Sequence, residues 1–281
     1  MNLAPDILKI DMQQTERRLL HFIRAYVEKT QAKGLTVGLS GGVDSSTVAA
    51  LSAKAIGGDK VLGICLPERQ TWNEQDIQHA KDVSRMFTIQ FKLIDITSTI
   101  KTIRKTIPNH TPEQRIPDGN IKARSRMVIL YYYANSLQRL VAGSGDKSEV
   151  MLGYFTKWGD YCADLAPLAD LFKTQVQTLA RHLNLPEEIV MKPPTPSLWP
   201  GQSAEGELGL KYETLDLILY GLEHFMLPED ISRQLNLPLE SISRIEERWL
   251  QSEHKRRPPL AMKIGYRSVA HDFRLPHSLS Q

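Results

Sequence analysis

Apolar residues recur at helical spacing from about Met12 to Thr30 and then give way to a short apolar run, Leu35–Leu39. The first pattern predicts an amphipathic helix and the second a buried strand. Ser-Gly-Gly closes the run, and Asp-Ser-Ser-Thr then precedes an Ala-rich stretch, which is typical of a helix N-terminus. The chain therefore begins with a predicted helix, strand, glycine turn and helix, in that order.

The same alternation continues toward the middle of the chain. Strands are predicted at Lys60–Leu66, Phe91–Ile96 and Leu140–Gly143, and helices at Asn73–Phe87, at Asn120–Gln138 and from about Lys147. Strands that alternate with helices of this length indicate βαβ units and a parallel sheet. Because ligands bind at the carboxyl ends of the strands in such sheets, we expect the chemistry in the loops after Leu39, Leu66 and Gly143.

Two proline-rich segments, Thr106–Gly119 and Met191–Gly209, interrupt the alternation. Both exceed the usual connection length, which indicates lids or linkers rather than packed structure. We expect Thr71–Gln75 or Met191–Gly209 to order over a bound ligand. Amphipathic helix then returns, at Tyr212–Leu222, Glu229–Leu235 and Ser241–Leu250. The prediction is one α/β domain over residues 1–281 with a helical C-terminal region from about residue 210.

Composition narrows the class of protein. The 281 residues are enough to fold without a disulfide or zinc, and 41% hydrophobic with 24% charged residues is typical of a globular chain. The 35 basic and 32 acidic residues give a net charge of +3, too balanced to indicate nucleic acid or a membrane surface. Cys65 and Cys162 lie far apart, and no apolar run approaches a membrane span. We therefore expect a cytoplasmic protein with no nucleic-acid or membrane partner.

The clearest local motif is Gly38-Leu39-Ser40-Gly41-Gly42-Val43-Asp44-Ser45-Ser46, between the first predicted strand and its helix. Its glycines allow positive φ and let backbone N–H groups approach an anion, its serines add donors, and a helix N-terminus favours negative charge. It is not a Walker A loop, because it has no G-x-x-x-x-G-K-[ST]. With Asp44 and no lysine, the loop favours a phosphate bridged by magnesium. The alternative is a tight turn with Asp44 as an N-cap.

The string from Ser40 to Ser45 resembles the loop of the N-type ATP pyrophosphatases, which cleave ATP to AMP and pyrophosphate while adenylating a substrate. Further motifs follow in order: Gly119–Met127, Gly143–Glu149, Gly153–Asp160, Ala163–Leu168, Leu171–Gln175, Lys192–Thr195, Leu198–Trp199, Glu207–Gly209 and Glu253–Pro259. This series resembles the NAD synthetase family from about Gly34 to Lys263.

The resemblance implies a Rossmann-like, doubly wound parallel sheet of the adenine nucleotide alpha-hydrolase type, usually in a homodimer. It implies ATP- and Mg²⁺-dependent amidation of deamido-NAD (nicotinate adenine dinucleotide) with ammonia to NAD, through an adenylated carboxylate, with release of AMP and pyrophosphate. The chain length leaves no room for a glutamine-hydrolysing domain, so we expect the ammonia-dependent enzyme. The physiological source of the ammonia stays open.

The resemblance also implies roles for individual residues. ATP would be held by Gly38, Leu39, Ser40, Gly41, Gly42, Val43, Asp44, Ser45, Ser144, Lys173 and Thr195, and deamido-NAD by Arg124, Lys157, Asp164, His254 and Lys255. Magnesium would be held by Asp44 and Glu149, which join Lys157 and Lys173 as the catalytic set. Many family members have Thr-Asp-His after the glycine where this chain has Ser144-Gly145-Asp146-Lys147; the serine keeps the hydroxyl.

Other interpretations of these residues stay open. Glu149 could simply complement a helix dipole, and His254-Lys255-Arg256-Arg257 could be a solvated run of charge. Within the superfamily, the chain could perform a GMP-synthetase-like amidation or a tRNA thiolation, the second of which would need Cys65 or Cys162 as a sulfur carrier. It could also be a nucleotide-sensing module without catalysis. The adenylation chemistry itself needs no protein nucleophile, so the lack of a conspicuous Ser/His/Asp or Cys/His set is expected for it.

Overall fold

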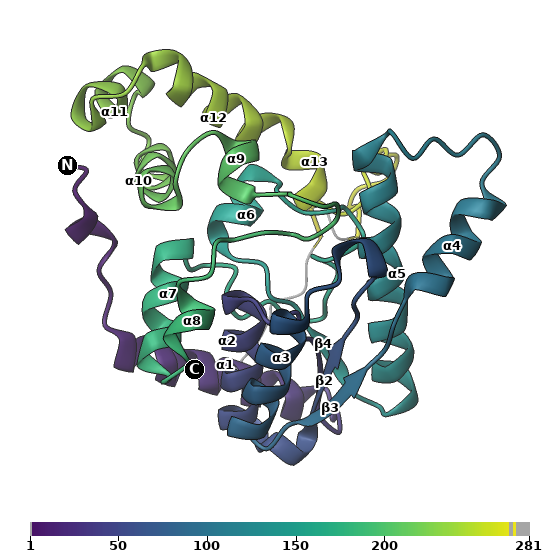
Figure 1. Ribbon diagram of the computed structural model, residues 1–281. Helices are drawn as coiled ribbons and strands as arrows, with labels where there is room; N and C mark the ends of the chain where they lie inside the picture. The colour runs from purple at the N-terminus through teal and green to yellow at the C-terminus, as the bar shows by residue number, and fades with distance from the viewer. Residues whose placement is uncertain (1, 270–271, 274–281) are drawn as a thin grey trace.

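The computed structural model describes residues 2–269, 272 and 273. Within these residues one parallel sheet has the strand order β3-β2-β1-β4, formed by β1 (Leu35–Gly38), β2 (Val61–Cys65), β3 (Gln90–Leu93) and β4 (Leu140–Ala142). The chain moves outward from β1 to β3 and then returns to place β4 on the other side of β1 (Figure 1). This arrangement confirms the doubly wound parallel sheet. It also makes the gap beyond the carboxyl ends of β1 and β4 the switch point at which ligands bind in such folds.

Both faces of the sheet are covered, and β2 shows this residue by residue. Val61 and Cys65 belong to one buried apolar cluster, while Leu62 and Ile64 belong to another. Successive side chains of a strand point to opposite faces, so the continuous apolar run VLGIC is what a strand buried on both sides requires.

Helices pack on the two faces in unequal numbers (Figure 1). The larger cluster joins the sheet to α1 (Met12–Lys29), α2 (Val43–Ile56), α3 (Glu74–Met86), α7 (Lys173–His182) and α8 (Glu187–Val190). The opposite face is covered by α4 (Thr97–Thr106) and α5 (Arg115–Ser136). Short 3₁₀ turns lie at Pro5–Leu8, Gly58–Lys60 and Arg69–Thr71.

A separate apolar cluster forms where the helical C-terminal region meets the rest of the chain. It gathers α10 (Tyr212–Glu223), α11 (Pro228–Leu235) and α12 (Leu239–Gln251) around α6 (Lys147–Leu152), with α9 (Ala204–Leu208) beside them and α13 (Glu253–Arg256) following α12. Leu3 and Leu8 from the N-terminal end join the same cluster. The C-terminal helices therefore pack directly on the segment that follows β4.

The structure corrects the predictions in the middle of the chain. The strand predicted at Phe91–Ile96 ends at Leu93, because the Asp95 side chain accepts a hydrogen bond from the Thr97 backbone N–H at the start of the unpredicted helix α4. Thr106–Gly119 is not an unpacked linker throughout, since α5 begins at Arg115. Asp118 pairs with Arg104 and His110 and fixes this segment to α4.

The second proline-rich segment is also packed, contrary to expectation. Lys192 is paired with Asp76 on α3, and Ala204 and Leu208 on α9 are buried. An added Cβ on Gly119 would lie 3.0 Å from the Leu198 side chain, so the segment also touches α5. Among the described helices, none has both the length and the apolar character needed to cross a membrane.

Candidate active site

The glycine-serine loop joins β1 to α2 in a conformation that few other residues would allow. Gly41 has φ +79°, and an added Cβ would lie 2.1 Å from the backbone oxygen of Asp76. The Ser45 hydroxyl accepts a hydrogen bond from the Ser40 backbone N–H at 3.1 Å and donates one to the Gly42 carbonyl at 3.1 Å. Gly42 is the N-cap of α2, so the interpretation of Asp44 as an N-cap is wrong. The Asp44 carboxylate is therefore free to contact other parts of the chain.

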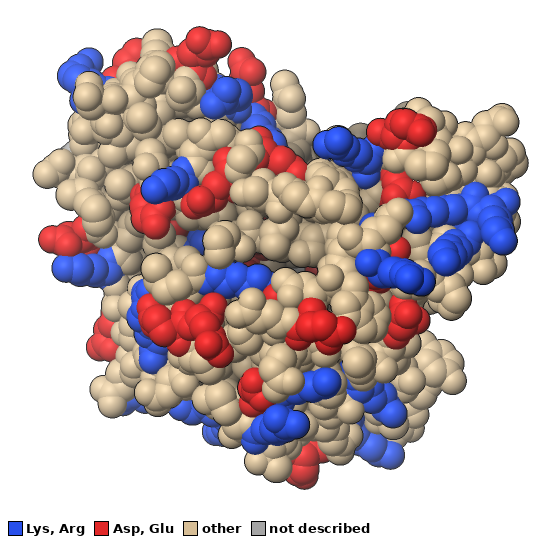
Figure 2. Space-filling model, viewed as in Figure 1, with Lys and Arg blue, Asp and Glu red and all other residues tan. Residues whose placement is uncertain are grey.

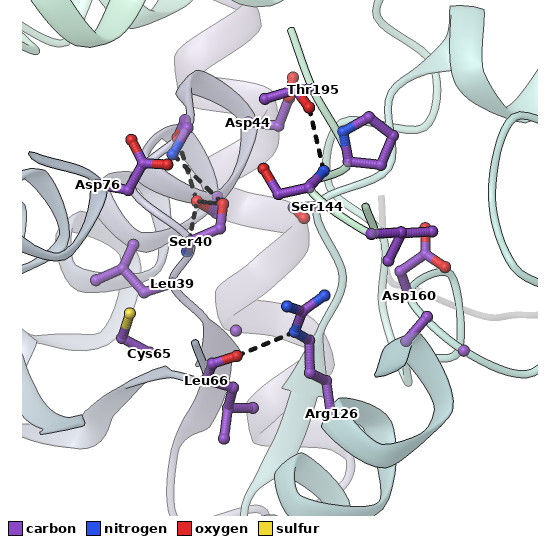
Figure 3. A pocket seen from close by; sticks show the side chains of 18 of the residues that line it. Leu39, Ser40, Asp44, Cys65, Leu66, Asp76, Arg126, Ser144, Asp160 and Thr195 are labelled. Carbon is purple, nitrogen blue, oxygen red and sulfur yellow. Dashed lines mark hydrogen bonds between the residues drawn. The ribbon is translucent and has the colours of Figure 1, made fainter. Parts of the chain in front are cut away.

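A cavity opens at this loop, at the switch point between β1 and β4. Its wall includes most of the loop together with Ser144, Glu149 and the proline-rich residues from Lys192 to Leu198. In Figure 3, Ser40, Asp44, Ser144 and Thr195 lie toward one end, while Leu39, Cys65 and Leu66 lie toward the other. Figure 2 shows the molecule hollowed near the centre of this face, with charged side chains of both signs around the hollow. One end of the cavity suits phosphates and the other an apolar ring.

Lys173 lies buried behind the polar end of the cavity, where its ammonium group contacts three carboxylates. Its Nζ is 2.6 Å from Asp146, 2.8 Å from Asp44 and 3.2 Å from Glu149. Asp44 follows β1 and Glu149 follows β4, and the two meet because these strands are neighbours in the sheet. Lys173 begins α7, which comes from a third part of the chain.

Asp146 is the member of this cluster that the sequence predictions missed. It is the N-cap of α6, and its side chain accepts a hydrogen bond from the Glu149 backbone N–H at 2.8 Å. Its carboxylate is fully buried, unlike those of Asp44 and Glu149. The signal was present, because Asp at N-cap with Glu three residues later is a capping pattern. That pattern indicates a helix start and says nothing of Lys173, which lies farther along the chain.

Burial and the neighbouring charges shift the pKa values within the cluster. Burial lowers the pKa of the Lys173 ammonium, but Asp146 and the other two carboxylates outweigh burial and hold that pKa well above its usual value. Burial, with the charge of Asp146 next in effect, raises the pKa of Glu149 well above its usual range. Burial also raises the pKa of Asp146, although Lys173 opposes this shift. One ammonium is therefore too little positive charge for three ionised carboxylates.

This excess of negative charge fits a divalent cation. Oxygen atoms of Asp44, Asp146 and Glu149 lie within 4.8 Å of one another. Asp44 Oδ1 is buried and has no hydrogen-bond partner among the described residues, so it is available as a ligand. Magnesium takes carboxylate oxygens together with phosphate oxygens, which this end of the cavity could supply when a nucleotide is bound.

Comparison with known proteins shows the family in which this loop, cavity and charged cluster occur. The family model described as NAD synthase matches residues 15–259. The chain belongs to the NAD synthase family. It is 46% identical over 254 residues to the NH(3)-dependent NAD(+) synthetase of Methanocaldococcus jannaschii, covering 90% of this chain and 98% of that protein. It is 44% identical to the corresponding protein of Hyperthermus butylicus, covering 91% of this chain and 92% of that one.

Solved structures agree with this assignment. The NH3-dependent NAD synthetase of Campylobacter jejuni is 28% identical, with a TM-score of 0.76 over 91% of this chain and all of that chain. The NMN synthetase of Francisella tularensis is 31% identical, with a TM-score of 0.80 over 90% of this chain and 99% of that one. The α/β fold of this NAD synthase family member is thus shared along almost the whole chain of each.

The residues predicted to bind ATP in this family member meet at the cavity with two exceptions. Gly41 and Lys173 are not on its wall, whereas Gly38, Leu39, Ser40, Gly42, Val43, Asp44, Ser45, Ser144 and Thr195 are. Thr195 accepts a hydrogen bond from the Ser197 backbone N–H and donates one to the Gln202 carbonyl, which shapes the proline-rich segment. Arg126 also lines the cavity and donates to the Leu66 carbonyl at 3.1 Å (Figure 3). It lies within the Gly119–Met127 motif, but the motif alone gave it no role.

The five residues predicted to bind deamido-NAD are not on the cavity wall. Arg124 donates to the Lys157 carbonyl at 3.2 Å, and Lys157 Nζ lies 3.5 Å from His254 Nδ1, so these three form a second polar group beside α13. Lys255 Nζ instead donates to the carbonyls of Gly153 and Phe155 at 2.6 and 2.7 Å. Asp164 accepts a hydrogen bond from the Val141 backbone N–H at 2.7 Å. Lys255 thus stabilises the beginning of the segment 153–164, and Asp164 fixes its end to β4.

Proposed function

We propose that this chain is an ammonia-dependent NAD synthase, a ligase that joins ammonia to the carboxylate of deamido-NAD at the expense of ATP. Besides the family assignment, one observation carries the proposal. A lysine that begins a helix meets three carboxylates directly beside a glycine-serine loop at the switch point of the sheet. With a divalent cation held by these carboxylates, the site would stabilise a leaving pyrophosphate, since its charge must be held by cations and backbone donors.

The chain's own residues supply most of that stabilisation. Backbone N–H groups at the start of α2 and the Ser40, Ser45 and Ser144 hydroxyls would bind the ATP phosphates, and Lys173 would hold the pyrophosphate as it departs. Magnesium bound by Asp44 and Glu149 would neutralise phosphate charge there. The apolar end of the cavity would hold the adenine ring. The segment from Lys192 to Leu198 forms part of the cavity wall and would help to exclude water from the acyl adenylate.

The second polar group supports a site for deamido-NAD next to the cavity. Arg124 and Lys157 place two positive charges near one another, and His254 adds a ring from a third segment, which suits the phosphates of a dinucleotide. Lys255 and Asp164 would support this site through the loop contacts described above rather than touch the substrate. We further propose a homodimer through the outer face of α5, which carries Arg124 and exposes large apolar residues.

A product assay tests the proposed reaction. Purified protein with ATP, Mg²⁺, deamido-NAD and ammonium should yield NAD, AMP and pyrophosphate in equal amounts. Glutamine in place of ammonium should give at least about tenfold less product, because free ammonia is the nucleophile that the chemistry requires. Release of ADP and phosphate would contradict adenylation, and AMP release without NAD would contradict amidation.

The NMN synthetase structure motivates a second candidate, the formation of NMN by amidation of nicotinate mononucleotide. Its TM-score of 0.80 exceeds that of the Campylobacter jejuni NAD synthetase. The curated relatives at 44–46% identity favour the dinucleotide. Measuring kcat/KM for both acids in the same assay decides between them: a higher value for the mononucleotide would replace the proposed substrate.

A further inference from the structure

Asp216 is a buried carboxylate on α10 that lies outside the cavity wall. Its Oδ1 accepts a hydrogen bond from the Ser148 hydroxyl on α6 at 2.6 Å. Its Oδ2 accepts two from Thr174 on α7, from the backbone N–H at 2.9 Å and from the hydroxyl at 2.8 Å. A single carboxylate from the helical C-terminal region therefore holds two helices together.

The two helices are those that carry the Lys173 cluster. Ser148 lies between Asp146 and Glu149 in sequence, and Thr174 follows Lys173 directly. The Ser148 hydroxyl also accepts a hydrogen bond from the Lys173 backbone N–H at 3.1 Å. The first N–H groups of a helix have no partner within the helix, and here Ser148 and Asp216 satisfy the first two of α7. The start of α7 is thus fixed in register with the start of α6.

Tyr212 lies one turn before Asp216 on α10, and its ring lies next to the Lys173 ammonium. Its ring centre lies 5.3 Å from Lys173 Nζ, and the residue is buried. A ring face at this distance attracts an ammonium group. Helix α10 therefore contacts the Lys173 ammonium directly, through the Tyr212 ring. It contacts the Lys173 backbone indirectly, because Asp216 binds the Ser148 hydroxyl, which accepts the hydrogen bond from the Lys173 N–H.

We propose that Asp216 is a positioning residue of the active site, which sets where the Lys173 ammonium lies relative to Asp44 and Glu149. The inference rests on the proposed function, since it assigns a task to Lys173. A lysine side chain is a long flexible stem, so its ammonium is placed by its backbone origin and its partners. An amide at position 216 keeps one acceptor oxygen but turns a donor toward the buried donors of Ser148 or Thr174, so the first turn of α7 can shift. A displacement of about 1 Å at a reacting group can lower a rate about a hundredfold.

A double-mutant cycle with Asp216→Asn and Lys173→Gln tests this role. Asp216→Asn alone should lower kcat for NAD formation at least about tenfold, with KM for ammonium changed less than about twofold. In the Lys173→Gln background the same change should lower kcat less than about twofold, because residues that act through one another are not additive. An unchanged kcat for Asp216→Asn, or an equal loss in both backgrounds, would overturn the proposal.

Two further variants separate positioning from general loss of structure. Glu16→Gln is the matched control, since Glu16 pairs with His182 at the opposite end of α7 and with Lys54. It should keep kcat within about twofold even where it lowers the melting temperature. If Asp216→Asn does not fold, Ser148→Ala takes its place, because it removes the hydroxyl that joins Asp216 to the Lys173 backbone.

Binding of magnesium–ATP, measured by calorimetry, distinguishes this proposal from the proposed function. Asp216→Asn should weaken binding at least about fivefold, and less than twofold in the Lys173→Gln background, whatever acid the enzyme amidates. Wild-type protein that binds ATP with this coupling but forms no NAD would overturn the proposed function and leave the positioning role standing. Wild-type protein that forms NAD while the two changes act independently would overturn the positioning role alone.

Discussion

The three carboxylates around Lys173 are not equivalent. Asp146 is fully buried, whereas the side chains of Asp44 and Glu149 keep 20% and 23% of their surface exposed, and both line the cavity. Asp146 is thus positioned as a permanent counter-ion for the ammonium. Asp44 and Glu149 can exchange part of that contact for a cation that arrives with the nucleotide, because a divalent cation neutralises their charge more fully than a shared ammonium.

Replacement of Asp44 by Asn should therefore weaken magnesium binding specifically. We expect the Mg²⁺ concentration for half-maximal NAD formation to rise at least about tenfold, since the neutral amide loses the charge that attracts the cation. Magnesium titrations at saturating ATP measure this, and calorimetry of magnesium–ATP binding provides a readout without turnover.

Asp118→Asn is the control for the Asp44 variant, because Asp118 also pairs with basic side chains but lies away from the cavity. Its half-maximal Mg²⁺ concentration should stay within about twofold of the wild-type value. An Asp44 variant with the wild-type magnesium response would remove Asp44 from the metal site.

At the level of elements, α6, α7 and α10 meet at Asp216, and this contact should make stability depend on pH. Burial raises the pKa of Asp216 to about 7, despite hydrogen bonds from Ser148 and Thr174 that lower it. An unfolded chain releases the same proton near pH 4. Between about pH 4 and 7 the folded state therefore binds more protons, so stability falls as pH rises through this window.

The free energy of unfolding of the wild-type protein should fall by about 3 kcal/mol more than that of Asp216→Asn between pH 4.5 and 7.5. The amide cannot titrate, so the advantage of the wild-type protein is largest at the acidic end. Urea denaturation at several pH values measures the difference. Parallel curves for the two proteins would show that Asp216 does not ionise in this range in the folded state.

Local sequence patterns were enough to predict the helices with one clearly apolar face and the strands with a continuous apolar run. The helix predicted from Met12 to Thr30 and the strand at Lys60–Leu66 match α1 and β2 to within one residue at each end. The pattern failed at α4, whose polar sequence TSTIKTIRKT buries Ile100 against the sheet. It also failed at the start of α5, where the tie from Asp118 to Arg104 depends on two helices being side by side.

For the whole molecule, the outer face of α5 is the surface that we propose for contact with a second copy. Val128 and Tyr132, one turn apart on this helix, are 60% and 66% exposed, and exposed apolar side chains that lie side by side are typical of an interaction surface. Arg124, a proposed contact of deamido-NAD, lies on the same helix, so a dimer there would place the substrate near the interface.

Val128→Glu combined with Tyr132→Glu should convert the proposed homodimer to a monomer in size-exclusion chromatography with light scattering. Charged side chains at the centre of an apolar interface lose their hydration without gaining partners. Phe225→Glu is the matched control, because Phe225 is 94% exposed but follows α10, and it should leave the dimer intact. A wild-type monomer, or a dimer that survives both changes on α5, would exclude this interface.

The sequence by itself determined the alternation of strands and helices, the glycine-serine loop between the first strand and its helix, and the series of motifs that indicated the NAD synthase family. These features depend on residues that are close in the chain, where hydrophobic period, glycine and capping residues act locally. Only the tertiary structure placed Lys173 among Asp44, Asp146 and Glu149, and Asp216 behind them. Those contacts join α2, α6, α7 and α10, and their positions follow from strand order and helix packing, which no local pattern encodes.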